Sequence, residues 1–287
     1  MAVFERNYKR WDGEVTPHAT RFLILPRYLF RHVFASKLLV FFYAACFLFP
    51  VGCLAFIYLT HNATILQIFP DLLAQELFAI DGDFMNRFVA IQSAWAFFLA
   101  LFIGPGLISR DLANNGLPLY LSRPFSRTQY VVGKMTVLAV LLSPITWIAA
   151  LLVILAQTGF EGMGWLQQNV NLVMGVVVVS WLWILVLCLL ALSVSAWVRW
   201  KPIAGFVMLF ILMGGKLFAN MTNFLFKTEN GSLFDLGHLM AVMRAGMLGT
   251  EAPSDISPAA AMIAISAFVA FFLFLLNRKI RAYEVVS

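Results

Sequence analysis

The chain has 287 residues, of which 62% are hydrophobic and only 12% are charged, and its mean hydropathy is +0.87. Soluble globular domains carry about 25% charged residues, so this composition excludes a soluble domain and predicts an integral membrane protein. The formal net charge is +6, and the topology of membrane insertion explains such a surplus of lysine and arginine without nucleic-acid binding.

Six apolar stretches are long enough to cross a hydrocarbon layer, which requires about 20 helical residues. The segments outside them are all shorter than about 40 residues, too short for an independent core. We therefore predict an all-α integral membrane fold, with an N-terminal segment over 1–37 and one six-helix domain over 38–287. The predicted spans are 38–60, 88–108, 135–156, 170–197, 203–221 and 258–277.

The N-terminal segment carries acidic residues and no small-residue cleavage site, so we expect the first span to be retained rather than removed as a signal peptide. Its stretch "RFLILPRYLFRHVFASK" places Tyr28, Phe30 and Phe34 among Arg27 and Arg31. This pattern predicts an amphipathic helix lying in the membrane interface. A solvated basic leader is the alternative interpretation.

Lysine and arginine are unevenly distributed between the two sides of the predicted bundle. Sixteen of the 20 lie in the N-terminal segment, in 109–134, in 198–202 and in 278–287, whereas the opposite side holds nine acids. Positive residues accumulate on the cytoplasmic side of a membrane, so we predict that both termini and the 109–134 segment are cytoplasmic.

The segment between the second and third spans carries the strongest local signals. Gly104-Pro105-Gly106 is expected to break the second span, and residues 107–115 are predicted to form a short cytoplasmic helix that carries Arg110 and Asp111. Gly116 and Pro118 favour its end. Ser126 and Gln129 match a capping box for a helix that continues through Lys134 into the third span.

The fifth predicted span contains Lys216, the one charged residue inside the six spans. A lysine in hydrocarbon costs about 2.5 to 3.5 kcal/mol on insertion scales, so it should face a cavity, find a partner or reach the surface. We favour the last option because Lys216 lies near the outer end of the predicted span. Together with Gly214 and Gly215 it is the candidate for a substrate path or a dimer seam.

Between the fifth and sixth spans, "SLFDLGHLMAVMRAGML" (232–248) places Leu236, Leu239, Met240 and Met243 at helical spacing. We predict a short outer helix that rests on the membrane or dips into it. His238 has no second ligand at metal-binding spacing, so no metal site is predicted. The three cysteines lie in spans, so we predict neither a disulfide framework nor a zinc site.

A membrane-embedded enzyme needs clustered acids, histidines or a nucleophile with its base at bilayer depth, and the predicted spans contain no Asp, Glu or His. No catalytic residue is therefore predicted. A channel or secondary carrier needs ionisable groups or ion ligands near the midplane, and Lys216 alone could serve. A lipid-modifying enzyme and a carrier or channel remain the alternative functions.

The stretch "ISRDLANNGLPLYLSRPFSRTQYVVGK" (108–134) resembles the signature of ABC-2 type permeases, the membrane subunits of ATP-binding-cassette exporters. Asp111 stands where the family most often has glutamate. The positions that match the pattern are Asp111, Leu119, Leu121, Ser122, Pro124, Ser126, Arg127, Gly133 and Lys134.

The resemblance implies a bacterial inner-membrane protein that pairs with a second permease subunit, identical or related, above two ABC ATPase subunits. It also implies that the short helix between spans two and three is a coupling helix seated on the ATPase. The residues implied to contact the ATPase are Arg110, Asp111, Asn114, Arg123 and Arg127.

The chain contains no phosphate-binding loop of the form Gly-x-x-x-x-Gly-Lys-Ser/Thr. Gly133-Lys134 is followed by Met135, and Gly215-Lys216 is followed by Leu217. We therefore expect no cofactor in this chain, with ATP and magnesium bound by a partner ATPase.

Overall fold

The computed structural model describes residues 24–62, 80–114, 116 and 126–280. Within these ranges every regular element is helical, and six helices are long and apolar enough to cross a membrane. This confirms the prediction of an all-helical, six-span fold. The six helices are Lys37–Thr60, Gly82–Ala113, Arg127–Glu161, Val170–Trp197, Lys201–Phe226 and Pro258–Lys279.

The second, third and fifth helices extend beyond the predicted spans at both ends. Hydropathy detects only the apolar part of a helix, whereas backbone hydrogen bonding continues through polar turns on either side. The long helices are divided into shorter elements: α2 (Lys37–Ala45) and α3 (Leu48–Thr60); α5 (Gly82–Ile103) and α6 (Pro105–Ala113); α8 (Arg127–Leu142), the π-helical η4 (Pro144–Ile148) and α9 (Ala149–Glu161).

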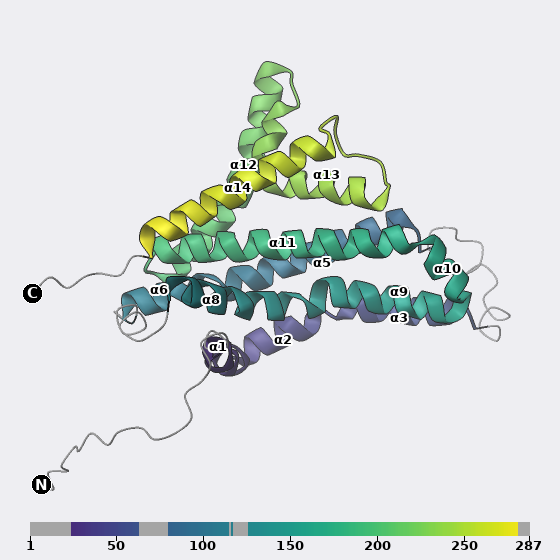
Figure 1. Ribbon diagram of the computed structural model, residues 1–287, viewed down its shortest axis with the longest axis horizontal. Helices are drawn as coiled ribbons and strands as arrows, with labels where there is room; N and C mark the ends of the chain where they lie inside the picture. The colour runs from purple at the N-terminus through teal and green to yellow at the C-terminus, as the bar shows by residue number, and fades with distance from the viewer. Residues whose placement is uncertain (1–23, 63–79, 115, 117–125, 281–287) are drawn as a thin grey trace, which may run out of the picture.

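The remaining elements are α1 (Ile24–Phe34), α10 (Met163–Gln168), α11 (Val170–Trp197), α12 (Lys201–Phe226), the short 3₁₀ helix η5 (Asn230–Phe234), α13 (Leu236–Leu248) and α14 (Pro258–Lys279). In Figure 1, α6, the start of α8 and the end of α14 lie at one end of the bundle, which we call the proximal end. The ends of α3 and α13 and the start of α5 lie towards the other, distal end.

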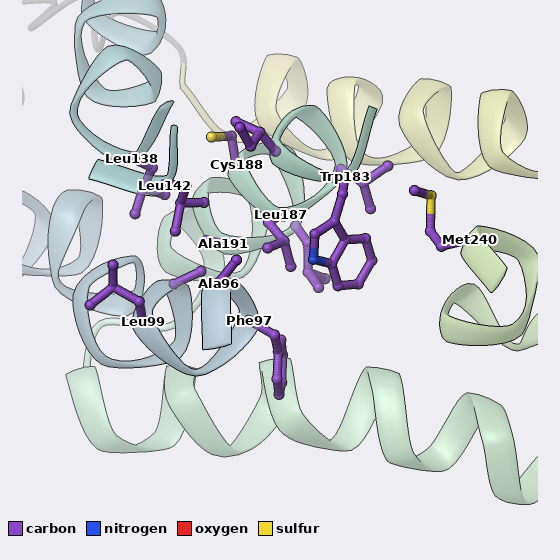
Figure 2. Close-up of a cluster of buried hydrophobic side chains, with 14 of the residues drawn as sticks. Ala96, Phe97, Leu99, Leu138, Leu142, Trp183, Leu187, Cys188, Ala191 and Met240 are labelled. Atoms are coloured by element: carbon purple, nitrogen blue, oxygen red, sulfur yellow. The ribbon is translucent and has the colours of Figure 1, made fainter. Parts of the chain in front are cut away.

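Helix α11 lies at the centre of the bundle and packs against α5, α6, α8, α12, α13 and α14 (Figure 1). Its sequence is apolar on every face, which is expected of a helix surrounded by other helices. Figure 2 shows the packing around it: Ala96 and Leu99 of α5, and Leu138 and Leu142 of α8, lie beside Leu187 and Ala191 of α11.

The predicted interruption at Gly104-Pro105-Gly106 is a helix boundary without a sharp turn. Gly104 ends α5 and Pro105 begins α6, yet Gly104 keeps right-handed helical angles, with φ −55° and ψ −47°. A Cβ atom at Gly104 would lie only 2.5 Å from the Cβ of Ala191. Glycine is therefore needed here because α5 and α11 touch, and the predicted change of direction is smaller than a full break.

Helix α1 occupies the stretch in which an amphipathic helix was predicted. It packs against α8, with Leu25 buried and Tyr28 exposed. The location of α1 at a membrane interface remains a prediction.

Helix α13 confirms the predicted helix over 232–248, and it begins at the cap Asp235, whose side chain accepts hydrogen bonds from the backbone N–H groups of Gly237 and His238. It packs against α5, α11, α12 and α14. Gly175 of α11 permits one of these approaches, because a Cβ there would lie 2.7 Å from the carbonyl oxygen of Met247. Helix α13 is therefore part of the bundle rather than a surface attachment.

Candidate functional site

A buried ion pair connects α6 to α8 at the proximal end. Lys134 Nζ lies 2.8 Å from Asp111 Oδ2, and the Tyr130 hydroxyl donates a hydrogen bond of 2.7 Å to the same oxygen. Tyr130 and Lys134 are four residues apart and so share one face of α8. The Lys134 side chain is 2% exposed and that of Asp111 18%. Three positions of the 108–134 stretch thus meet in one cluster, which we call the proximal triad.

The proximal triad changes the role expected of Asp111. Its carboxylate is held by two groups of the same chain, so it stabilises the attachment of α6 instead of standing free for a partner. Lys134 lies, as predicted, in the helix that leads into the third span, and the structure adds that its side chain is almost fully buried. The four-residue spacing from Tyr130 to Lys134 indicates in the sequence that the two side chains share a helix face. The pairing of Lys134 with Asp111 is visible only in the folded structure.

The other residues with an expected docking role are more accessible. Arg110 and Asn114 are exposed at the end of α6, and Arg127 is exposed at the first position of α8. Ser126 and Gln129 form the predicted capping box at this helix start. Arg123 lies outside the described residues.

A cavity of about 200 Å³ lies beside the proximal triad. Its lining comes from α1, α2, α5, α6, α8 and the start of α12, and includes Val33, Arg110, Asp111, Lys134 and Lys201. Helix α1 and the short helix α6 therefore face the same cavity.

A single hydroxyl joins α6 to the central helix. Ser195 Oγ accepts hydrogen bonds from the backbone N–H groups of Ile108 (3.0 Å) and Ser109 (2.9 Å), and it donates one to the carbonyl oxygen of Pro105 (2.7 Å). Ile108 and Ser109 lie in the second turn of α6, and Ser195 of α11 gives their N–H groups a partner outside that helix. Helix α6 is thereby bound to α11 as well as to α8.

A second, larger cavity of about 440 Å³ lies among α5, α11, α12 and α13, and we call it the central cavity. Trp183, one of its lining residues, is the fourteenth of the 28 residues of α11, so the cavity lies at about half the length of that helix. Its charged or titratable lining residues are Lys216, Asp235, His238 and Arg244.

Lys216 lies farther from the end of its helix than the predicted span implied, because α12 continues for ten residues beyond it, to Phe226, which is about 15 Å along the helix axis. The exposed Lys216 side chain lines the central cavity. That it also reaches the membrane surface, the option favoured in the sequence analysis, stays a prediction.

Contacts within the chain explain one of the two glycines beside Lys216. A Cβ at Gly215 would lie 2.7 Å from the carbonyl oxygen of Phe234, so Gly215 permits the close approach of η5 to α12. A Cβ at Gly214 would meet only the ring of Phe210 on its own helix. The dimer-seam hypothesis therefore no longer explains Gly215.

Arg244, like Asp235 and His238, is a lining residue that the sequence analysis did not select. Its Nε donates a hydrogen bond of 2.6 Å to Asn86 Oδ1, and Asn86 Nδ2 donates one to Thr250 Oγ1. Burial lowers the pKa of the Arg244 guanidinium from its ordinary value, but arginine stays protonated in proteins. Helical spacing places Arg244 one turn after Met240, at the edge of the apolar face of the predicted helix, and this position was the available signal.

No protein-family model matches the chain, and no curated protein shows a significant match to it. Within the described ranges, no group of three or more His, Cys, Asp or Glu side chains is placed to hold a metal ion. The functional argument therefore depends on the two sites themselves.

Proposed function

We propose that the chain is the permease subunit of an ATP-driven ABC exporter, of the ABC-2 type. The observation that carries the proposal is the proximal triad: Asp111, Tyr130 and Lys134 belong to the stretch that resembles the ABC-2 signature, and they bind α6 rigidly to α8. A helix that a motor protein pushes must be firmly joined to the membrane helices that move.

The contacts of α6 give such a push two routes into the bundle. One passes through the Asp111–Lys134 pair to α8 and the third span, and the other passes through Ser195 to α11. Arg110, Asn114 and Arg127 are the exposed polar side chains in this region that a soluble ATPase would contact. Asp111 acts as a positioning residue in this scheme.

The proposal includes partners that the chain does not contain. ABC ATPase subunits would bind ATP and magnesium, and a second permease subunit, identical or related, would complete the membrane part. The protein would lie in the bacterial inner membrane with both termini in the cytoplasm, as the distribution of lysine and arginine predicts.

A secondary carrier is the second candidate, and the buried Asp111–Lys134 pair is the observation that favours it, because carriers use ionisable groups inside the membrane. Lys134 is the eighth residue of a 35-residue helix, however, and so lies near its end. A coupling site of a carrier is expected near the midplane, which makes this candidate the weaker one.

The test is co-purification with candidate ATPases, followed by measurement of ATP hydrolysis in lipid. We expect Arg110→Glu to reduce both the recovery of the ATPase and the rate of hydrolysis at least tenfold, because it reverses an exposed charge on α6. The matched control is Lys227→Glu, which reverses an exposed charge after the last residue of α12. Equal recovery with both variants, or substrate transport without any ATPase, would contradict the proposal.

A further inference from the structure

The central cavity carries a surplus of positive charge at mid-depth in the bundle. Among its described lining residues, Lys216 and Arg244 are two cations and Asp235 is the one carboxylate. One oxygen of Asp235 already accepts two backbone hydrogen bonds at the start of α13. His238 also lines the cavity, and its Nε2 lies 2.8 Å from Ser254 Oγ.

Neither cation forms an ion pair with a described residue. Among the residues that the structure describes, the ion pairs are His61–Glu161 and Asp111–Lys134, so no described carboxylate lies within 4.0 Å of Lys216 or Arg244. Arg244 uses one N–H group for Asn86, and a guanidinium has five. Charged side chains at membrane depth normally pair or face a polar ligand, so two unpaired cations in one cavity point to an anionic occupant.

The rest of the lining is apolar and leaves space. Phe97, Trp183 and Met240 lie in the region shown in Figure 2, and Leu212 and Met213 complete the apolar wall. Ala90, Ser93 and Ala94 on α5 are small, which is why the helices leave a cavity here. A volume of about 440 Å³ falls within the usual range of ligand sites, about 300 to 1,000 Å³.

The cavity has an accessible edge on α12, where Met213 and Lys216 are exposed. Because α12 is one of the six helices able to cross a membrane, this exposed edge would face lipid once the helix spans the bilayer. A ligand with an apolar chain can enter by that route and keep the chain among apolar surroundings while its head group reaches the cations.

We infer that the central cavity binds the anionic head group, phosphate or carboxylate, of an amphipathic molecule. Lys216 and Arg244 bind the anion, and Phe97, Trp183 and Met213 contact the adjoining apolar part. The inference concerns binding by this chain alone, so it does not depend on the presence of an ATPase partner.

The experiment measures binding to the purified chain in neutral detergent, by thermal stabilisation and by native mass spectrometry. The probes are short-chain phosphatidylglycerol, short-chain phosphatidylcholine, and glycerol phosphate, which carries the anion without an apolar chain. We expect phosphatidylglycerol to bind at least tenfold more tightly than either of the others. Equal binding of phosphatidylcholine would overturn the role of charge, and equal binding of glycerol phosphate would overturn the role of the apolar chain.

Three variants locate the site. Lys216→Gln removes an exposed charge and is expected to weaken phosphatidylglycerol binding at least tenfold without loss of fold. Ala94→Phe fills the cavity while keeping both cations, and it should weaken binding to a similar extent. The matched control Lys227→Gln removes a cation from the same side of the chain but outside the cavity, and it should bind as the unaltered protein does. Unchanged affinity in Lys216→Gln and Ala94→Phe would place the lipid elsewhere and refute the inference.

Discussion

Lys134 shows how one residue can determine the arrangement of two helices. A lysine that is 2% exposed has exchanged nearly all of its water for protein, and this is tolerable because Asp111 lies 2.8 Å away. Burying an ion pair brings little net stability, but removing one partner leaves the other charge uncompensated. The pair therefore specifies where α6 attaches more than it stabilises the protein as a whole.

At this scale we predict that Asp111→Ala destabilises the protein by about 3 to 5 kcal/mol, because it strands the Lys134 charge. Tyr130→Phe removes one hydrogen bond to the same carboxylate and should cost only about 1 to 3 kcal/mol. The measurement is thermal or denaturant unfolding in detergent. The double variant Asp111→Leu with Lys134→Met removes both charges and should recover most of the loss. A double variant less stable than Asp111→Ala would contradict the argument.

At the scale of elements, glycines set how closely the helices approach α13. Gly175 on α11 faces the backbone of Met247, and backbone cannot move aside as a flexible side chain can. Gly159 on α9 has no atom within 4 Å of an added Cβ. The two positions are therefore a matched pair, since both are glycines inside long helices but only one lies at a contact.

We predict opposite effects for the same substitution at these two sites. Gly159→Ala should stabilise the protein by about 0.5 to 1 kcal/mol, because alanine loses less conformational freedom in a helix than glycine does. Gly175→Ala should destabilise it by about 1 to 3 kcal/mol through overpacking. Melting temperatures in detergent measure both changes. If both variants shift in the same direction, α13 does not pack on α11 as described.

The elements differ in how well the sequence predicts them. The existence of α13 and the capping box at Ser126 could be predicted, because both depend on residues close together in the chain. The Asp111–Lys134 pair could not, because its members are 23 positions apart and only the packing of α6 beside α8 brings them together. The length of α12 beyond Lys216 could not be predicted either, because the helix continues through turns that hydropathy does not detect.

At the scale of the whole molecule, composition alone predicted six spanning helices, because hydrocarbon thickness fixes their length and apolar character. It could not predict that α11 would be the central helix, since several spans are equally apolar. The central cavity could not be predicted from the sequence either, because its lining residues, such as Ala90 and Arg244, come from distant parts of the chain.

The orientation of the molecule is predicted from charge and can be tested with thiol labelling. Cys46, Cys53 and Cys188 are all buried, so the unaltered protein should react little with a membrane-impermeant maleimide. We predict that Lys227→Cys is labelled in intact cells, whereas Arg199→Cys is labelled only after the membrane is opened, because both replace exposed residues on opposite sides. The reverse pattern would show that the positive residues face outwards.

The three hydrogen bonds of Ser195 have a mechanical consequence. Its oxygen can satisfy Ile108, Ser109 and Pro105 only while α6 keeps its present register against α11. A sliding displacement of the short helix would break all three at once, so intermediate positions gain nothing from partial contact. We therefore expect the junction between α6 and α11 to have one stable arrangement, and to separate in a single step under load rather than to stretch.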